Sequence, residues 1–436
     1  MRSSLPKVLH QVGGRAMVDW SIALAKAAGC DRIVVVCSPA GQAVQAHVSN
    51  VLGDTAIAIQ DPPQGTGHAV LCAKQALSDF DGELVVLYGD TPLIPAESIE
   101  ALFGELQSGA RVGVLGFNAA EPGAYGRLIT DDQGNLDAIV EAKDASPEQL
   151  AVRFCNSGVI AAASGDMFDL LAKVTNDNAK GEYYLTDIVE LARASGGTCR
   201  AVVCDEVDVL GVNSRVELAE AEAAFQSRRR AELLASGVTM IAPETVYFSH
   251  DTQIDNDVTL EPHIVFGLGV SIQSGARVRA FSHIEGATVG PGCEIGPYVR
   301  LRPGAVLARG AKIGNFVEVK NTRVGEGAKA NHLAYLGDGD VGADANIGAG
   351  TIFCNYDGFL KHRTEIGAGA FIGSNSALVA PVTIGAGAIV GSGSVITKNV
   401  DPDALAVARG RQMQKAGWAT AFRDKMAAIK AARKKG

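Results

Sequence analysis

Aliphatic side chains recur every six residues through much of the second half of this 436-residue chain. The first series is Ile254, Leu260, Phe266, Ile272, Val278 and Ile284, and the last is Ile366, Ile372, Leu378, Ile384, Val390 and Ile396. A helix has a period of about 3.6 residues and a strand a period of about 2, so neither alone produces this spacing. The period predicts a solenoid of short strands, in which stacked repeats bury the aliphatic side chain that one repeat leaves exposed.

Glycine usage supports the same interpretation. The chain holds 51 glycines, about 12% of its residues against a usual ~7%. Many follow the aliphatic position directly, as in Ile366-Gly367 and Ile384-Gly385, where a turn needs unusual dihedral angles. The pattern resembles the hexapeptide-repeat family. That resemblance implies a left-handed parallel β-helix with three hexads per coil, about eight coils, and a homotrimer.

Residues 1–240 carry a different pattern, in which short apolar runs alternate with amphipathic ones. Strands are expected at 32–37, 83–88, 112–117 and 202–203, and helices at 17–29, 67–77 and 98–107. The alternation predicts a Rossmann-like α/β domain with a mainly parallel sheet. A charged run over 214–235 follows and opens with Ser214-x-x-Glu217, a capping-box pattern that predicts a linker helix.

Charge and hydropathy narrow the classes of function. The net charge of -9 disfavours nucleic-acid binding. No run of about 18 apolar residues is present, so no membrane insertion is expected. The first residues lack the apolar core of a signal peptide. The eight cysteines form no C-x-x-C pair, which fits a cytoplasmic protein without a structural zinc site or a disulfide framework.

Three short features of the first half suggest a site for a phosphorylated ligand. Asp90 follows the apolar strand at 84–88, at the edge where α/β sheets bind ligands, and either holds Mg²⁺ or opens a turn. The glycine-containing segment 64–69 opens a helix and is either an anion-binding loop or a tight turn. Lys7 either neutralises a phosphate or lies on the surface.

The motifs of the first half occur in one order along the chain. They are LPKVLH, QGTGHA, LYGD, YGR, VEAKDA, CNSGV, GEYYLTD and GVNSR. This series closely resembles the sugar-nucleotide pyrophosphorylases. With the hexapeptide half behind it, the whole chain resembles the bifunctional N-acetylglucosamine-1-phosphate uridylyltransferase/glucosamine-1-phosphate acetyltransferase family.

The resemblance implies two reactions and a division of the chain. Acetyl-CoA would acetylate glucosamine 1-phosphate, and UTP would then react with N-acetylglucosamine 1-phosphate to release pyrophosphate, in cell-wall and lipopolysaccharide synthesis. The implied parts are a pyrophosphorylase domain at 1–213, a linker helix at 214–240, a β-helix acetyltransferase domain at 241–405 and a basic tail at 406–436.

The resemblance also assigns roles at matching positions of the first half. Asp90 and Asn213 would hold Mg²⁺, and Lys7 would contact phosphate. The residues that would contact UTP and the sugar nucleotide are Gln60, Gly65, Thr66, Tyr88, Gly89, Asp90, Gly126, Glu141, Asn156 and Asn213. Charge neutralisation and alignment by the metal and the lysine would then carry most of the transfer.

One segment of the family pattern has no counterpart in this sequence. The family begins with an apolar strand and a nucleotide loop of the form L-A-A-G-x-G-T-R-M, and Met1 falls at the position of the loop's last Met. Either the strand is encoded upstream of a misplaced start, or the chain begins here with an impaired first domain. Without the first strand, the neighbouring strands of the sheet would lose hydrogen-bonding partners. The sequence therefore leaves open whether the chain as written has uridylyltransferase activity.

The six-residue repeat breaks between Val324 and Val341 and again between Phe353 and Ile366. A regular solenoid needs no breaks, so they predict functional loops. From the residues alone, a single His in such a loop could simply be a surface histidine. The resemblance instead implies that His332 is the general base that takes a proton from the sugar amine. Glucosamine 1-phosphate would be bound by Arg302, Lys320, Tyr335, Asn346, Asn355, Tyr356 and Lys361. An acetyl-CoA groove between subunits would be lined by Ala349, Ser374, Ser392 and Arg409.

Other classes of protein fit the sequence less well. A zinc carbonic anhydrase on the same solenoid needs three converging histidines, and His263, His283 and His332 do not share a coil-compatible spacing. A purely structural solenoid would have uniform coils. A monofunctional acetyltransferase with an inactive, truncated first domain stays open as an alternative, although both proposed Mg²⁺ ligands are retained. The basic tail is either solvated or docks on an anionic ligand.

Overall fold

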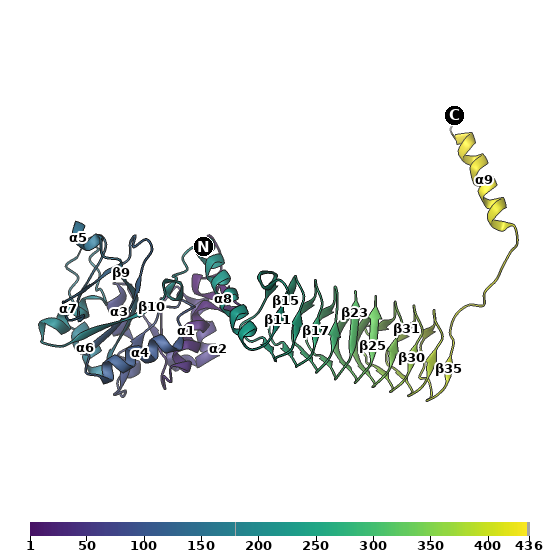
Figure 1. Cartoon of the computed structure of the whole chain (residues 1–436), viewed down its shortest axis with the longest axis horizontal. Helices are drawn as coiled ribbons and strands as arrows, with labels where there is room; N and C mark the ends of the chain where they lie inside the picture. The colour runs from purple at the N-terminus through teal and green to yellow at the C-terminus, as the bar shows by residue number, and fades with distance from the viewer. Residues whose placement is uncertain (179, 434–436) are drawn as a thin grey trace. The chain divides into compact units, whose positions relative to one another are not determined.

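The computed structural model describes residues 1–178 and 180–433. They form two compact units (Figure 1). The first unit contains Met1–Glu232 and Phe248–His250, and the second contains Leu233–Tyr247 and the residues from Asp251 onward.

The first unit is an α/β fold. Its helices are α1 Met17–Ala27, α2 Gln42–Leu52, α3 Thr66–Cys72, α4 Ala96–Gln107, α5 Pro147–Leu150, α6 Ser164–Leu171 and α7 Asp187–Ala194, with α8 Arg215–Ala235 beginning in it. Its strands are β1 Gln11–Val12, β2 Arg15–Ala16, β3 Val35–Cys37, β4 Ile57–Ile59, β5 Glu83–Val86, β6 Val112–Asn118, β7 Arg127–Thr130, β8 Leu136–Val140, β9 Phe154–Ala163 and β10 Cys199–Cys204. Every helix and strand expected from the alternation has a counterpart here, with ends that differ by a few residues.

Six strands form the main sheet of this unit, in the order β10-β6-β9-β7-β8 with β5 also paired to β9. β5 and β6 both run antiparallel to β9, and β10 runs parallel to β6, so β5, β6 and β10 point the same way. These three strands run in the common direction expected for an α/β sheet, but the long reversed strand β9 lies between β5 and β6. Most strand pairs of the main sheet are therefore antiparallel. β3 and β4 form a separate parallel pair that no described strand joins to the main sheet.

β6 is buried on both faces because its alternate side chains enter two hydrophobic clusters. Val112 and Val114 pack in a cluster with residues of α6 and α7. Leu115 and Phe117 pack in the other, with residues of α4. All four side chains are fully buried. Two-sided burial is typical of a strand covered by helices on both faces, and it fixes β6 in the interior of the unit.

The second unit is a solenoid of short parallel strands. They are β11 Thr239–Met240, β12 Val246–Tyr247, β13 Gln253–Ile254, β14 Thr259–Leu260, β15 Ile264–Phe266, β16 Ser271–Ile272, β17 Arg277–Val278, β18 His283–Ile284, β19 Ala287–Val289, β20 Glu294–Ile295, β21 Arg300–Leu301, β22 Ala305–Leu307, β23 Lys312–Asn315, β24 Glu318–Val324, β25 Lys329–His332, β26 Tyr335–Val341, β27 Asn346–Ile347, β28 Ile352–Cys354, β29 Thr364–Ile366, β30 Phe371–Ile372, β31 Ala377–Val379, β32 Val382–Ile384, β33 Ile389–Val390, β34 Val395–Ile396 and β35 Leu405–Ala406. One ladder stacks ten strands, from β11 to β35. The expectation of about eight coils was too low because β11 and β35 flank the periodic series.

The aliphatic series points inward, as the period predicts. Ile284 and Leu301 pair in register on successive coils, and both are fully buried. The length of a regular coil follows from other register partners. His332 lies 17 residues after its partner on the preceding coil, and Lys312 lies 18 residues after its own. A regular coil is therefore three hexads, or one residue short of that.

The first apparent break is not a loop. Val324 pairs directly with Val341 on the next coil, so the chain takes an ordinary step there. Ala330 and Leu336 occupy the intervening inward positions and are buried. The six-residue period was not recognised in the sequence because Ala330 stands at an inward position where the other repeats have a larger aliphatic residue.

The second break is a true excursion. Val341 pairs with Ile366, so this coil contains more residues than a regular one. The surplus leaves the solenoid between β28 and β29 as a loop, where Tyr356 and Lys361 form an antiparallel bridge. After β35, the described part of the basic tail contains α9, Trp418–Arg433, whose residues are all exposed.

Candidate functional sites

Lys7 lies between two oxygen atoms in the first unit. Its Nζ donates to Asp90 Oδ2 at 2.6 Å and to Asn213 Oδ1 at 2.9 Å. These three residues meet because Asp90 follows β5, and the backbone N–H of Val212 donates to Asp90 O at 2.9 Å. A carboxylate oxygen and an amide oxygen thus converge on one cation.

A capping box orients Asn213. Glu217 Oε2 accepts from the backbone N–H groups of Asn213 at 2.6 Å and of Ser214 at 2.7 Å, and Glu217 N donates to Ser214 Oγ at 3.2 Å. The hydrogen bond from the Asn213 backbone is the main reason that the pKa of Glu217 lies below its ordinary value. The capping box predicted from Ser214-x-x-Glu217 is confirmed as the start of α8.

The loop before α3 is shaped by close backbone contacts. Gly65 has a φ of +106°, and a Cβ there would lie 2.6 Å from Tyr183 O. Gln60 Nε2 donates to Gly65 O at 2.9 Å, and Leu185 N donates to Thr66 Oγ1 at 3.0 Å. The fold therefore requires a glycine at position 65 and brings together Gln60, Gly65 and Thr66, three of the residues predicted to contact UTP and the sugar nucleotide.

Tyr88 follows the same end of β5. Burial, with the negative charges of Asp90 and Glu141, raises the pKa of its phenol to about 12. Its ring packs on Gly158, where a Cβ would lie 2.8 Å from the ring. Gly89 forms the turn between Tyr88 and Asp90. The phenol is therefore a neutral hydrogen-bonding group beside the carboxylate.

Gly126, Glu141 and Asn156 meet at the antiparallel side of the sheet. Asn156 N donates to Gly126 O at 2.8 Å. A Cβ on Gly126 would lie 3.5 Å from Glu141 Oε1 and 3.7 Å from Asn156 Cβ. Burial raises the pKa of Glu141. Three residues predicted to contact the sugar nucleotide are thus neighbours: Gly126 just before β7, Glu141 just after β8 and Asn156 on β9.

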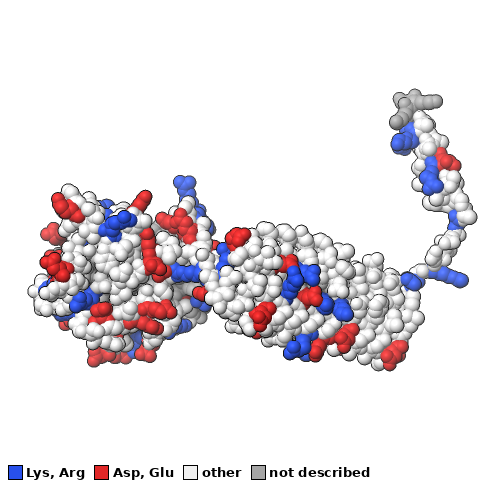
Figure 2. All heavy atoms as spheres, in the orientation of Figure 1, with Lys and Arg blue, Asp and Glu red and all other residues white. Residues whose placement is uncertain are grey.

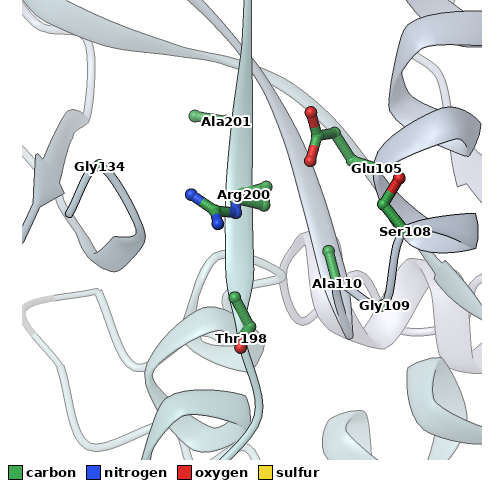
Figure 3. Close-up of a pocket in the computed structure, with 8 residues that line it drawn as sticks. All are labelled: Glu105, Ser108, Gly109, Ala110, Gly134, Thr198, Arg200 and Ala201. Atoms are coloured by element: carbon green, nitrogen blue, oxygen red, sulfur yellow. The ribbon is translucent and has the colours of Figure 1, made fainter.

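A cavity of about 450 Å³ in the first unit lies elsewhere (Figure 3). Two of its lining residues are Ala110, just before β6, and Thr198, just before β10, so it lies at the amino ends of these strands. Figure 3 shows Arg200 on β10 and Glu105 on α4 at different sides of it. Ligands of α/β sheets bind at the carboxyl ends instead, where Asp90 lies, so this cavity is separate from the predicted site.

His332 ends β25 on the solenoid, where its side chain is exposed. Its Nδ1 lies 2.7 Å from Asn315 Oδ1, and the two residues are register partners on β23 and β25. An amide oxygen can only accept, so Nδ1 carries the proton of this contact, and in the neutral imidazole the lone pair then lies on Nε2. Asn346 lies on β27, the next strand of the same ladder.

Arg302 and Tyr335 lie close to a shared carboxylate. Arg302 Nη1 donates to Glu318 Oε1 at 2.8 Å, and this hydrogen bond raises the pKa of the guanidinium. Glu318 is the register partner of Tyr335. Asn355 Nδ2 in turn donates to Tyr335 OH at 3.4 Å.

Asp338 is the centre of a further polar network. Its carboxylate accepts from Asn321 Nδ2 at 2.7 Å and from Asn355 Nδ2 at 2.5 Å. Burial raises the pKa of Asp338, but these hydrogen bonds and the charges of Lys320 and Lys361 outweigh it, so the pKa is lowered. The buried carboxylate therefore contacts one predicted substrate residue, Asn355, and is stabilised by the charges of two others, Lys320 and Lys361.

Lys361 and Tyr356 lie on the loop of the long coil. Lys361 Nζ is 4.8 Å from the centroid of the Tyr356 ring. Tyr356 itself is exposed. The two predicted residues thus form a cation–π pair at the surface.

Sequence reasoning missed Asn315, Glu318 and Asp338. The signal that finds them is the coil length. Asn315 stands 17 residues before His332, and Glu318 stands one coil before its register partner Tyr335. Asp338 occurs in the motif NHLAYLGD and is 17 residues from each of its two amide partners.

The four predicted acetyl-CoA residues share one corner of the solenoid. They are Ala349, Ser374, Ser392 and Arg409. Asn375 N donates to Ala349 O at 2.7 Å, and Gly393 N donates to Ser374 O at 2.8 Å. Arg409 Nη1 donates to Ser392 O at 2.7 Å. The residues therefore form a row along successive coils.

Acidic and basic side chains are intermixed on the visible face of the solenoid (Figure 2). Glu294 pairs with Arg279 at 3.1 Å and with Lys312 at 2.7 Å. Arg277 pairs with Glu261 at 2.7 Å. Arg277, Arg279 and Lys312 therefore each form an ion pair within the chain.

Within residues 1–178 and 180–433, no three His, Cys, Asp or Glu side chains are grouped so as to hold a metal ion. The same part of the chain contains no helix with the length and apolar character needed to cross a membrane.

Comparisons with known proteins match both halves of the chain. Residues 1–189 match the MobA-like NTP transferase domain, and residues 286–321 and 363–398 match the bacterial transferase hexapeptide (six repeats). The bifunctional protein GlmU of Hyphomonas neptunium is 64% identical over 433 residues, which are 99% of this chain and 94% of that protein. The GlmU proteins of Caulobacter vibrioides and a Jannaschia species are 56% and 51% identical, over 100% of this chain and 93% and 95% of their own length.

These matches confirm the fold class as an α/β nucleotidyltransferase domain followed by a left-handed parallel β-helix. They do not support the expectation that the first strand and the nucleotide loop are lacking, because the relatives match essentially the whole of this chain. By its identity to these relatives over nearly their full length, the chain belongs to the family of the bifunctional GlmU proteins.

Proposed function

We propose that the chain acetylates glucosamine 1-phosphate with acetyl-CoA and then joins the product to UTP, giving UDP-N-acetylglucosamine and pyrophosphate. The observation that carries this proposal is the presence of two separate clusters of reactive groups in one chain. Lys7, Asp90 and Asn213 converge in the first unit, and His332 faces Asn315 in the second. The monofunctional alternative is not favoured, since it gives the first cluster no use.

In acetyl transfer, His332 acts as the general base. The amine nitrogen of glucosamine 1-phosphate forms a bond to the acetyl carbonyl carbon, and the carbon–sulfur bond of acetyl-CoA breaks. Nε2 of His332 accepts the proton that the amine loses, and the thiolate of coenzyme A leaves. Asn315 supports this role because it keeps the other ring nitrogen protonated.

The phosphate of glucosamine 1-phosphate is held by Arg302, Lys320 and Lys361, whose cations favour phosphate oxygens. Glu318 supports the position of Arg302 through their 2.8 Å contact. Tyr335, Asn346, Asn355 and Tyr356 bind the sugar. Acetyl-CoA lies along the corner formed by Ala349, Ser374, Ser392 and Arg409.

In uridylyl transfer, an oxygen of the sugar phosphate forms a bond to the α-phosphorus of UTP, and pyrophosphate leaves as the α–β bridging bond breaks. Gln60, Gly65 and Thr66 hold the uridine side. Tyr88, Gly89, Gly126, Glu141 and Asn156 hold the sugar nucleotide. Lys7 neutralises phosphate charge, which is the main catalytic need of phosphoryl-type transfer.

The residues near Lys7 fit a magnesium ion. Asp90 and Asn213 offer a carboxylate oxygen and an amide oxygen that already converge on one cation, and Mg²⁺ takes oxygen ligands. One or two protein ligands suffice for Mg²⁺ when substrate phosphates supply the rest. When bound there, Mg²⁺ would neutralise charge on the triphosphate.

We also propose a homotrimer in the cytoplasm. The hexapeptide repeat supports the trimer, since an acetyl-CoA groove between subunits needs a neighbouring copy. All eight cysteines are free thiols, which fits a reducing compartment.

Two assays on the purified chain test the function. Release of coenzyme A from acetyl-CoA and glucosamine 1-phosphate follows the first reaction. Release of pyrophosphate from UTP and N-acetylglucosamine 1-phosphate, with Mg²⁺ or with a chelator, follows the second. We expect both, and only the second should need the metal. Acetyl transfer alone would establish the monofunctional alternative, and a folded chain with neither activity would overturn the proposal.

A further inference from the structure

The loop of the long coil is a small hairpin with an anchored base and a bare tip. Tyr356 and Lys361 form an antiparallel bridge, and His362 N donates to Asn355 O at 2.8 Å. Asn355 is only 5% exposed and belongs to the Asp338 network, whereas Phe359 at the tip is 91% exposed. Apolar packing therefore does not order the tip.

The carboxylate of Asp357 orders it instead. Oδ1 accepts from the backbone N–H groups of Phe359 at 2.8 Å and Leu360 at 2.7 Å. Oδ2 lies 2.8 Å from His362 Nε2, on the returning strand. The Leu360 backbone donor and His362 hold the pKa of Asp357 well below its ordinary value, so the carboxylate is charged at neutral pH. One side chain thus closes the turn and ties it to the strand.

This clamp fixes the two residues that flank it. Tyr356 precedes Asp357, and Lys361 precedes His362, so the Asp357–His362 contact sets the separation of both. Lys361 Nζ then lies over the Tyr356 ring, and Tyr356 OH donates to Gly358 O at 2.6 Å. An exposed lysine and tyrosine otherwise have many rotamers to lose on binding a ligand.

We propose that Asp357, through His362, is a positioning residue for acetyl transfer, which orders the Tyr356–Lys361 hairpin before glucosamine 1-phosphate binds. The inference rests on the proposed function of the second unit. Asp357 contacts no reacting atom and acts through Lys361 and Tyr356. Its removal adds an ordering cost to substrate binding and leaves the chemistry at His332 in place.

Steady-state kinetics of acetyl transfer by the full chain test this. We expect Asp357→Ala to raise KM for glucosamine 1-phosphate about 10-fold, the cost of ordering one or two side chains, with kcat and KM for acetyl-CoA nearly unchanged. Asp357→Asn keeps an acceptor for the two backbone N–H groups and loses the charge, so its KM should lie between. His362→Gln, which still offers an N–H to Asp357, should rescue most of the loss seen in His362→Ala.

Asp255→Ala is the matched control, because Asp255 is an exposed aspartate on an early coil. Amide hydrogen exchange of residues 355–363 without ligand gives a readout independent of catalysis. Exchange should be faster in Asp357→Ala and unchanged in Asp255→Ala. Unaltered exchange, or an unaltered KM despite faster exchange, would overturn the inference, as would a loss confined to kcat. A wild-type chain without acetyl transfer would instead overturn the proposed function, while exchange would still report whether the clamp exists.

Discussion

His332 and Asn315 face each other from neighbouring coils, with 2.7 Å between Nδ1 of the imidazole and Oδ1 of the amide. They are separated by one turn of the solenoid and pair in register. The stacking of the coils, and not a flexible loop, therefore sets the orientation of the imidazole.

Replacement of His332 tests its role as general base. His332→Ala should lower the rate of acetyl transfer by ~10²–10⁴-fold, the usual contribution of a general base. Pyrophosphate release should stay at the wild-type rate because it belongs to the other unit. Both rates are measured on one preparation, and an equal loss of both activities would contradict two separate sites.

Asn315 should matter through the tautomer of His332. Asn315→Ala frees the ring to take either tautomer, and we expect kcat for acetyl transfer to fall about 10-fold with little change in KM. Asn315→Asp keeps an acceptor for Nδ1–H and should retain more activity. If the alanine and aspartate variants behave alike, the contact has no part in orienting the base.

Asp90 should be essential for uridylyl transfer. Asp90→Asn keeps the shape but removes the charge that Lys7 or a metal ion meets. We expect pyrophosphate release to fall at least about 100-fold, a loss typical of one electrostatic group in an active site, and to need more Mg²⁺. Acetyl transfer serves as the internal control. A variant with a normal Mg²⁺ requirement would remove Asp90 from the proposed metal ligands.

Asp187, at the start of α7, makes the stability of the first unit depend on pH. Burial, with Glu190 and Glu141 nearby, raises its pKa from 3.8 to about 6. Because the pKa of Asp187 is higher in the folded state, protonation of this carboxyl favours folding. Its contribution to the free energy of unfolding is complete below pH 3.8 and is lost as the pH rises through 6.

Asp187→Asn should therefore stabilise the first unit at about pH 7.5, by roughly 1 kcal/mol after solvent screening, and should have little effect at about pH 4. Thermal unfolding of both proteins at the two pH values measures this. A difference of equal size at both values would point to packing instead of charge.

Gly367 tests how tightly the coils stack. A Cβ there would lie 2.4 Å from Ala386 N and 2.7 Å from Ala386 Cα, which are backbone atoms of the next coil. Gly367→Ala should destabilise the solenoid by about 2–4 kcal/mol and lower acetyl transfer, with pyrophosphate release unaffected. Gly410→Ala is the control, because a Cβ at Gly410 meets nothing within 4 Å. Denaturant unfolding compares the two variants, and equal stability would show that the coils can separate without cost.

The solenoid could be predicted because its signal is local and repeated. Each inward position, such as Ile284 or Leu301, is read from one residue and its spacing. In the α/β unit, three helices (α1, α3 and α4) and four strands (β3, β5, β6 and β10) were predictable from their apolar runs. β9 was not, because its reversed direction depends on pairing with β5 and β6, which no period within β9 records.

The candidate sites divide in the same way. Lys7 and Asn213 carry no local mark of their contact with each other, since 206 residues separate them. Asp338 is unremarkable in sequence, and its importance comes from burial between two amides on adjacent coils. The family resemblance predicted the residues that would face the ligands. The contacts that orient those residues could be identified only from the three-dimensional structure.

The row formed by Ala349, Ser374, Ser392 and Arg409 shows that the spacing between coils does not depend on the number of residues in a coil. More of the chain lies between Ala349 and Ser374 than between Ser374 and Ser392, yet each step is one level of a ladder. Levels are about 4.8 Å apart, so the row spans roughly 14 Å however much chain lies between its members. The distance between neighbouring coils along the solenoid axis is therefore independent of how many residues each coil contains. One coil can carry inserted residues that form a binding loop, while the residues stacked along the axis keep their spacing.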